Sequence, residues 1–211
     1  YSHVSTYFSI ARQSYSTAKS CSEQISTLSD YPDEDTVFDG HLLGKREYDA
    51  VLIYVIFTAL TAEAMINKYL FLQRQAGKLS KRLFEHMDKK MRTEEKWGIA
   101  TQYLNSSEAQ KLLDYGCEPM QSLMALFKLR NKLVHARQGK LDIATFDSDM
   151  HVTAKDITEK PSPYNIAFEN TKHYIETVQS LMKVLQQLDP ENVSDWLDQN
   201  DWVEPIIDIK A

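Results

Sequence analysis

The residues with the greatest capacity for chemistry lie in one stretch, residues 128–140. It contains five lysines and arginines and one histidine but no acidic residue, in a chain whose formal net charge is −6. Arg130, Asn131 and His135 are the members that could act on a ligand. A guanidinium binds phosphate or carboxylate through paired hydrogen bonds, and an imidazole exchanges protons near neutral pH. This combination indicates a candidate site for an anionic ligand, and a solvated helix end is the alternative.

The helical pattern around this stretch places Arg130 on an apolar face. We predict a helix from Glu118 to Ala136, with Pro119 near its first turn. Steps of three and four residues align Arg130 with apolar side chains, namely Met120, Leu123, Phe127 and Val134. An unpaired buried charge is costly. Arg130 must therefore pair with an acid such as Glu63, or face a ligand or partner, and the pattern leaves both alternatives open.

The spacing also restricts how the three polar residues can cooperate. Asn131 and His135 are four residues apart, so their side chains are neighbours on one helix face. Arg130 and His135 are five residues apart, which is about 140° around an ideal helix. One straight helix cannot aim both at the same phosphate. They can converge if the helix ends near His135, or if a second copy of the chain contributes its own pair.

The segment Arg130-Asn131-Lys132-Leu133-Val134-His135 resembles the signature of the HEPN superfamily. In that signature an arginine is followed by a polar residue and, four to six positions on, by a histidine. The resemblance extends over roughly residues 5–188, with an apolar second helix around residues 62–70, the motif late in a third helix and a long closing helix. It implies a metal-independent endoribonuclease that works without cofactors as a homodimer, with both motifs lining one cleft.

The resemblance also implies a role for each residue. Arg130 would hold the scissile phosphate, and His135 would exchange protons with the ribose 2′-OH or the leaving 5′-oxygen. Asn131 would orient His135 or the phosphate. Glu63 would be the acid of the second helix and a partner of Arg130 or His135. Additional attraction for phosphate would come from Lys128, Lys132 and Arg137.

Other interpretations of the same residues remain open. Lysines and a histidine at a helix C-terminus are favoured by the helix dipole without any ligand. Members of the superfamily also serve as non-catalytic dimerisation or interaction modules, and the aromatic tail around Trp196 and Trp202 suits the docking of a partner. The hypotheses are therefore an RNase, as a toxin or defence effector with an antitoxin-like protein partner, and a non-catalytic homodimeric module.

The elements that must position this site are predicted to be helices. Six Gly and six Pro are spread thinly among 211 residues, which favours an all-α bundle of four to five main helices with extra short ones. Residues 1–188 form this bundle, and residues 189–211 form an aromatic and acidic tail that docks on it. Polar connections are expected at residues 29–44 and 139–163, where 141–146 suit a small strand or an extended loop. The expected helices span about 7–28, 45–75, 79–91, 93–104, 105–116, 118–136 and 163–188.

Composition restricts the class of protein further. The hydrophobic share of 43% and charged share of 26% are those of a soluble globular protein. Cys21 and Cys117 match no metal or redox spacing, which favours a reduced, cytoplasmic protein. The longest uncharged stretch, residues 50–62, is shorter than the roughly 20 residues of a membrane span, and predicts a buried core helix and no membrane role. The histidines and cysteines show no metal-ligand spacing, and the charges of residues 76–104 indicate a solvated face.

Overall fold

The computed structural model describes residues 3–28, 34–102, 113–134 and 166–198. These residues form helices, turns and loops but no strand, which confirms the predicted all-α class. Residues 105–112 of the helix predicted at 105–116, and the segment 141–146, lie outside the described residues, and residues 113–116 form turns instead of a helix. The described helices are α1 (Val4–Ser26), α2 (Glu34–Gln75), α3 (Lys81–Lys90), α4 (Thr93–Gln102), α6 (Met120–Val134), α7 (Phe168–Thr171) and α8 (Tyr174–Leu188).

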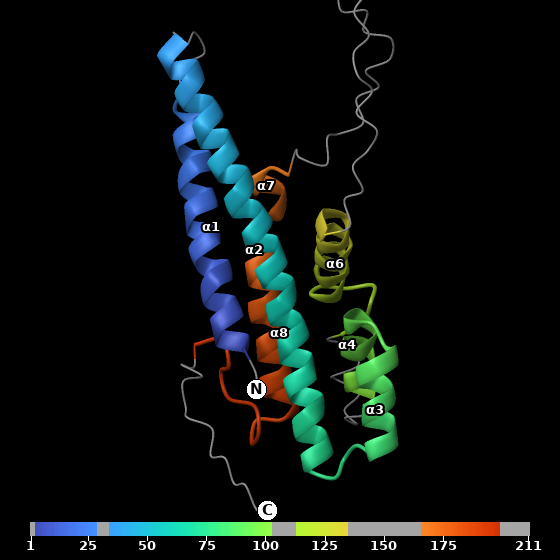
Figure 1. Ribbon diagram of the computed structural model, residues 1–211. Helices are drawn as coiled ribbons and strands as arrows, with labels where there is room; N and C mark the ends of the chain where they lie inside the picture. The colour runs from blue at the N-terminus through green and yellow to red at the C-terminus, as the bar shows by residue number, and fades with distance from the viewer. Residues whose placement is uncertain (1–2, 29–33, 103–112, 135–165, 199–211) are drawn as a thin grey trace, which may run out of the picture.

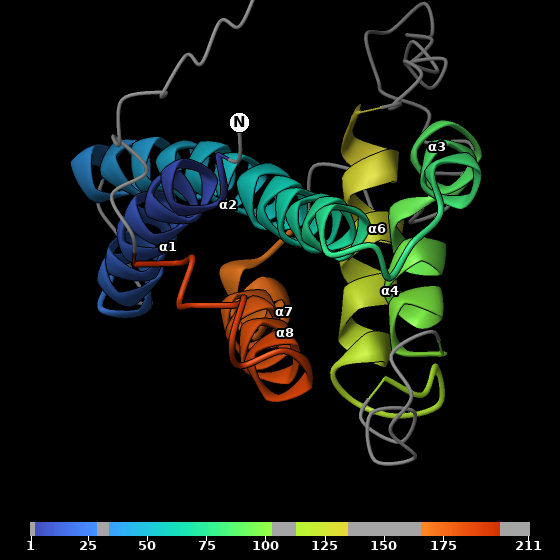
Figure 2. The same ribbon diagram turned by 90° about the horizontal axis from the view of Figure 1, so that it is seen from below.

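Helix α2 is the central element, as its nearly continuous apolar sequence predicts. It packs against α1, α3, α4, α6, α7 and α8. Helix α1 runs antiparallel along it, and the end of this hairpin where α2 begins extends past the other helices (Figure 1). Seen from below, α1 and α8 lie to one side of α2, and α4 and α6 lie together on the other (Figure 2). A helix apolar on most sides is buried by neighbours on several faces.

The start of α2 differs from its predicted position. A polar loop was expected through residue 44, but α2 begins at Glu34 and continues through Gly40 and Gly44. Each interior glycine costs a helix about 1 kcal/mol, and tertiary packing offsets such costs. A Cβ atom at Gly40 would lie 3.2 Å from the Leu28 side chain. The close approach of Leu28, two residues after the end of α1, therefore accounts for one of the two glycines.

The closing helix, predicted as one element from residue 163 to 188, is divided into α7 and α8. It ends at Leu188 as predicted, before Asp189 and Pro190. The division coincides with the Tyr54 hydroxyl of α2, which donates to the Thr171 carbonyl at 3.1 Å and accepts from the Ile175 N–H at 2.8 Å. A side chain inserted between a carbonyl and the N–H four residues on interrupts helical hydrogen bonding.

The described part of the tail, residues 189–198, packs on the bundle. Trp196 is only 2% exposed, and the Lys68 ammonium lies 4.6 Å from its ring centroid. The Asp189 carboxylate accepts a hydrogen bond from the Gln73 amide at 2.5 Å, which joins the start of the tail to α2. Trp196 is thus part of the core of its own chain and is not free to dock a partner, and Trp202 lies outside the described residues.

One helix in the described part of the chain meets the length and composition of a membrane span. It is the segment Val37–Gln75 of α2, and 56% of its most apolar window is buried inside the molecule. The core helix of a soluble protein meets the same criterion. The burial of Val51, Tyr54, Val55 and Ala59 in the hydrophobic core agrees with the core position that the sequence predicts for this stretch.

Candidate functional site

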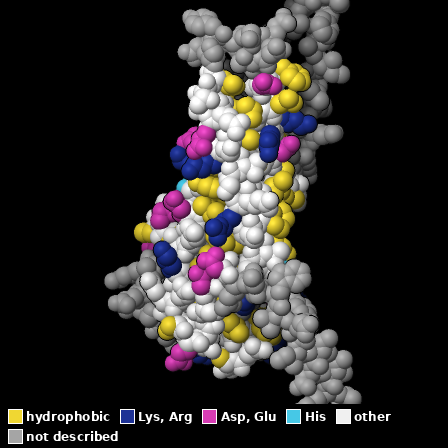
Figure 3. All heavy atoms as spheres, turned by 90° about the vertical axis from the view of Figure 1, so that its left-hand side faces the viewer, with side chains coloured by type: hydrophobic (Ala, Val, Ile, Leu, Met, Phe, Trp, Pro, Cys, Tyr) yellow, Lys and Arg dark blue, Asp and Glu magenta, His cyan; other side chains and the backbone are white. Residues whose placement is uncertain are grey.

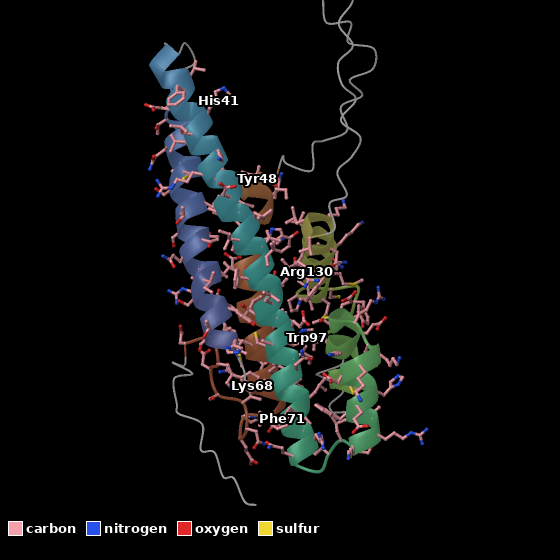
Figure 4. All side chains as sticks on the ribbon, in the orientation of Figure 1. His41, Tyr48, Lys68, Phe71, Trp97 and Arg130 are labelled. Carbon is pink, nitrogen blue, oxygen red and sulfur yellow. The ribbon has the colours of Figure 1, made fainter. Side chains whose placement is uncertain are left out.

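Arg130 lies on the side of α6 that faces α2 (Figure 4). Leu123, Leu126 and Phe127 are buried on that side, and Arg130 follows one helical turn later, half-buried. The predicted interruption of an apolar stripe by a charge is therefore present. The position is unusual for an arginine, because a charge withdrawn from water needs a compensating partner.

The partner of Arg130 is neutral. Its Nη1 donates to the Asn131 side-chain oxygen at 3.0 Å, and its Nε is buried without a hydrogen-bond partner. Among the described residues Arg130 forms no ion pair, so the pairing with Glu63 that the sequence suggested is not formed there. The guanidinium is held by an amide that leaves its charge uncompensated.

The other basic residues of this helix end differ in accessibility. Lys128, Asn131 and Lys132 are exposed on α6, so both lysines are accessible to a polyanion. His135 and Arg137 lie outside the described residues, which end here at Val134. The structure thus brings Arg130 and Asn131 together and surrounds them with exposed cationic side chains from the same turn and the turn before.

The rest of the surface carries charges of both signs. Figure 3 views the molecule from the side of α1, and acidic and basic side chains are interspersed on that face. A polyanion such as RNA needs a surface where cations cluster. The last two turns of α6 offer such a group, since Lys128, Arg130 and Lys132 follow one another without an intervening acid.

Glu63 lies at a different site, in a cavity on α2. This cavity has a volume of about 650 Å³, and Glu63, Asn67 and Lys68 line it together with Lys96 of α4. Lys96 is only 5% exposed, and its Nζ donates to the Asn67 side-chain oxygen at 2.8 Å. The predicted solvated face of residues 76–104 is therefore wrong for Lys96, whereas Lys81, Arg82, Lys89 and Lys90 are exposed as expected.

The sequence held no signal for this second cluster beyond the polar residues that end the apolar stretch of α2. Asn67 and Lys96 are 29 residues apart, and only the packing of α4 across α2 makes them neighbours. Trp97, the next residue, is fully buried and donates to the Ala62 carbonyl at 3.2 Å. Anchoring of Trp97 against α2 places Lys96 beside the cavity.

No grouping of three or more histidine, cysteine or acidic side chains that could hold a metal ion occurs within the described ranges. Comparisons with protein-family models, with curated proteins and with solved structures found no match to this chain. Any functional conclusion therefore depends on the chemistry of the two clusters, Arg130 with Asn131 on α6 and Lys96 with Asn67 at the cavity.

Proposed function

We propose that this protein is a HEPN-like, metal-independent endoribonuclease that acts as a homodimer, with a role as a toxin or defence effector in the cytoplasm. The observation that carries the proposal is the guanidinium of Arg130, which is held by Asn131 at 3.0 Å in a cationic helix end and has no carboxylate partner among the described residues. A purely structural arginine in this half-buried position would be expected to pair with a carboxylate. A phosphate group supplies the missing negative charge.

The proposed reaction is the attack of a ribose 2′-oxygen on the adjacent phosphorus. The His135 imidazole takes the 2′-OH proton, the 2′-oxygen bonds to phosphorus, and the bond to the 5′-oxygen breaks as that oxygen takes a proton from a protonated His135 imidazole. The products are a 2′,3′-cyclic phosphate and a 5′-hydroxyl end. Arg130 stabilises the charge that develops on the non-bridging oxygens. Lys128 and Lys132 hold neighbouring phosphates.

A homodimer is what the resemblance to the HEPN superfamily implies, and an arginine and a histidine five residues apart would point about 140° apart on an ideal helix. A second copy that packs through α6 would bring two such pairs to one cleft. The outer face of α6 presents the apolar side chain of Met124, 43% exposed, beside Lys128 and Asn131. An exposed apolar side chain among the basic residues suits a contact between copies, with an antitoxin-like protein as a further partner of the same surface.

The test is incubation of the purified protein with single-stranded RNA in the presence of a chelator, with separation of the products by length. We expect cleavage that yields cyclic phosphate ends and that Arg130→Ala and His135→Ala each reduce by about 10²-fold or more. Arg82→Ala, an exposed arginine of α3, is the matched control. Absence of cleavage, or equal cleavage by Arg130→Ala and Arg82→Ala, rejects the proposal.

A stability measurement separates this role of Arg130 from a structural one. Removal of one member of a buried ion pair costs about 3–5 kcal/mol. Arg130 has no such partner among the described residues, and its Nε is unsatisfied. We therefore expect Arg130→Met to change the free energy of unfolding by less than about 1 kcal/mol, while RNA cleavage is lost. A large loss of stability would identify Arg130 as a structural residue.

The second candidate function is a non-catalytic homodimeric module. It is favoured by three exposed apolar side chains, Val37, Phe38 and Leu42, on the projecting part of α2, where Phe38 is 63% exposed. Apolar side chains grouped on a protruding helix suit a contact with a second copy of the chain. The tail takes no part in this dimer contact, since its Trp196 is buried.

Light scattering on variants distinguishes the two candidates. The nuclease proposal predicts that Met124→Asp converts the dimer into a monomer and abolishes cleavage, while Phe38→Asp has no effect on either. The non-catalytic module predicts that Phe38→Asp converts the dimer into a monomer and that Met124→Asp leaves the dimer intact. It also predicts that neither the wild type nor any variant cleaves RNA. A wild-type protein that is monomeric at all concentrations tested contradicts both.

A further inference from the structure

The cavity on α2 has the size and lining of a small-molecule site. It lies between the start of α1, the lower half of α2, and helices α3 and α4, and has a volume of about 650 Å³. Tyr7, Phe71 and Phe84 give it aromatic walls, and Leu60 and Ala64 lie on the same face of α2. Ligand sites typically measure about 300–1,000 Å³ and combine apolar walls with a few polar groups.

Two opposite charges line this cavity without neutralising each other. Lys96 is almost fully buried, and among the described residues it has one hydrogen bond, to the neutral Asn67 side chain at 2.8 Å. An ammonium group has three donors, so further donors remain for a ligand. Glu63 is half-buried and has no hydrogen bond or ion pair among the described residues. The two charges form no ion pair with one another within 4.0 Å.

The spacing of these two charges limits which ligands can contact both. Glu63 and Asn67 are one helical turn apart on the same face of α2, which separates their Cβ atoms by about 5–6 Å. Lys96 is fixed at the Asn67 end by its hydrogen bond. The cavity therefore offers a positive group and a negative group about one turn apart, beside aromatic walls. A ligand that satisfies both must carry an anion and a cation close together and an apolar body.

We infer that this cavity binds a small zwitterion of the α-amino acid type that bears an aromatic or large apolar side chain. The ligand carboxylate accepts hydrogen bonds from Lys96, and the ligand ammonium donates to Glu63. Charge-assisted bonds of this kind are about twice as strong as neutral ones. The site is separate from Arg130 and independent of the proposed nuclease activity.

The remaining groups around the cavity suit the apolar part of the ligand. Phe71 is 45% exposed and packs edge-on against Phe84 with ring centroids 6.4 Å apart, so both rings can contact a ligand side chain. Lys68 lies over the Trp196 ring at 4.6 Å, and Asp88 is exposed on α3. These two charges are of opposite sign, so the charges lining the cavity suit a ligand without net charge.

The experiment is calorimetric titration of the full chain with phenylalanine, leucine and diphenylalanine. Phenylalanine amide, which lacks the carboxylate, and N-acetylphenylalanine, which lacks the ammonium, serve as matched analogues. We expect phenylalanine or the dipeptide to bind and each analogue to bind at least about tenfold more weakly, since each loses one charge-assisted hydrogen bond. Failure of all three zwitterions to bind the folded protein at millimolar concentration overturns the inference.

Variants assign the two ends of the ligand. Lys96→Met should abolish the tighter binding of phenylalanine relative to phenylalanine amide. Glu63→Gln should abolish the tighter binding of phenylalanine relative to N-acetylphenylalanine. Phe71→Ala, at an exposed position that does not endanger folding, should weaken aromatic ligands more than leucine. Lys89→Met, an exposed lysine of α3, is the control. If the wild type, Glu63→Gln and Phe71→Ala bind phenylalanine and its analogues with equal affinities, the assignment of the ligand's two ends is overturned. This outcome counts even if Lys96→Met fails to fold. RNA cleavage plays no part in this readout.

Discussion

The hydroxyl of Tyr54 accepts a hydrogen bond from the backbone N–H of Ile175 at 2.8 Å. The same hydroxyl donates to the carbonyl of Thr171 at 3.1 Å, so it joins two backbone groups that would bond to each other in an uninterrupted helix. A side chain of the central helix thus sets the point where α7 ends and α8 begins. Burial also raises the pKa of Tyr54 above its ordinary value, which keeps the hydroxyl protonated as a donor.

The same substitution at two tyrosines of α2 should have opposite consequences. Tyr54→Phe removes both hydrogen bonds and should lower the free energy of unfolding by about 1–3 kcal/mol. The Tyr69 hydroxyl is buried without a hydrogen-bond partner, so Tyr69→Phe removes an unsatisfied polar group and should be neutral or stabilising by up to about 1 kcal/mol. Urea unfolding of both variants measures the difference, and equal losses would contradict these roles.

Alkaline pH should destabilise the protein through its buried tyrosines. Burial raises the pKa of Tyr54, Tyr69 and Tyr174 in the folded state, whereas tyrosines of the unfolded chain ionise near pH ~10. Above that pH the unfolded chain loses protons that the folded chain keeps. The contribution of these protonated tyrosines to the free energy of unfolding is therefore complete below pH ~10. It falls as pH rises above that value, by at most about 1.4 kcal/mol per pH unit for each tyrosine.

Urea unfolding between pH 8 and pH 11.5 measures this dependence. Tyr69→Phe should show a shallower decline than the wild type above pH ~10, because one of the titrating groups is gone. Far-ultraviolet circular dichroism reports the helix content in parallel. Identical slopes for the wild type and the variant would contradict the assignment to Tyr69.

Gly98 on α4 should be intolerant of alanine for a reason that lies on another segment. A Cβ atom at Gly98 would collide with the Tyr115 hydroxyl oxygen, and that hydroxyl donates to the Glu94 carbonyl at 3.1 Å. Gly98→Ala alone should cost about 1 kcal/mol, because the exposed Tyr115 must move. In a Tyr115→Ala background the same change should stabilise by up to about 1 kcal/mol through helix propensity.

A double-mutant cycle measured by thermal unfolding checks this coupling. The control pair is Gly44→Ala with and without Tyr115→Ala, since a Cβ atom at Gly44 would meet no atom within 4 Å. The effect of Gly44→Ala on thermal stability should be the same with and without Tyr115→Ala. Additive effects of Gly98→Ala and Tyr115→Ala would show that the contact has no energetic role.

The tail around Trp196 should behave as part of the folded domain. Trp196 is buried and contacts Lys68, so Trp196→Ala should cost about 3–5 kcal/mol of unfolding free energy. Phe38→Ala, which removes an aromatic ring that is exposed, should change the unfolding free energy by less than about 1 kcal/mol. A loss at Trp196 no larger than that at Phe38 would mean that the tail only rests on the bundle surface.

What the sequence by itself determined about this protein was the class and order of its helices. The α-helical periodicity of α1, α6 and α8 and the apolar length of α2 are properties of neighbouring residues, so they predict elements and approximate ends such as Leu188. The chemistry of residues 128–140 was equally visible, because charge and residue type need no fold to be recognised. The position of Arg130 on the inner face of α6 also followed from spacing alone.

Only the tertiary structure decided where these elements begin, break and meet. Leu28 lies close to α2 at Gly40, Tyr54 divides α7 from α8, and the packing of α4 buries Lys96 beside Asn67. The same packing leaves Arg130 to the neutral Asn131 and places Glu63 in the cavity. The contacts of Tyr54 and Lys96 join residues distant in the chain, and their energy outweighs the local preferences that a sequence pattern reports.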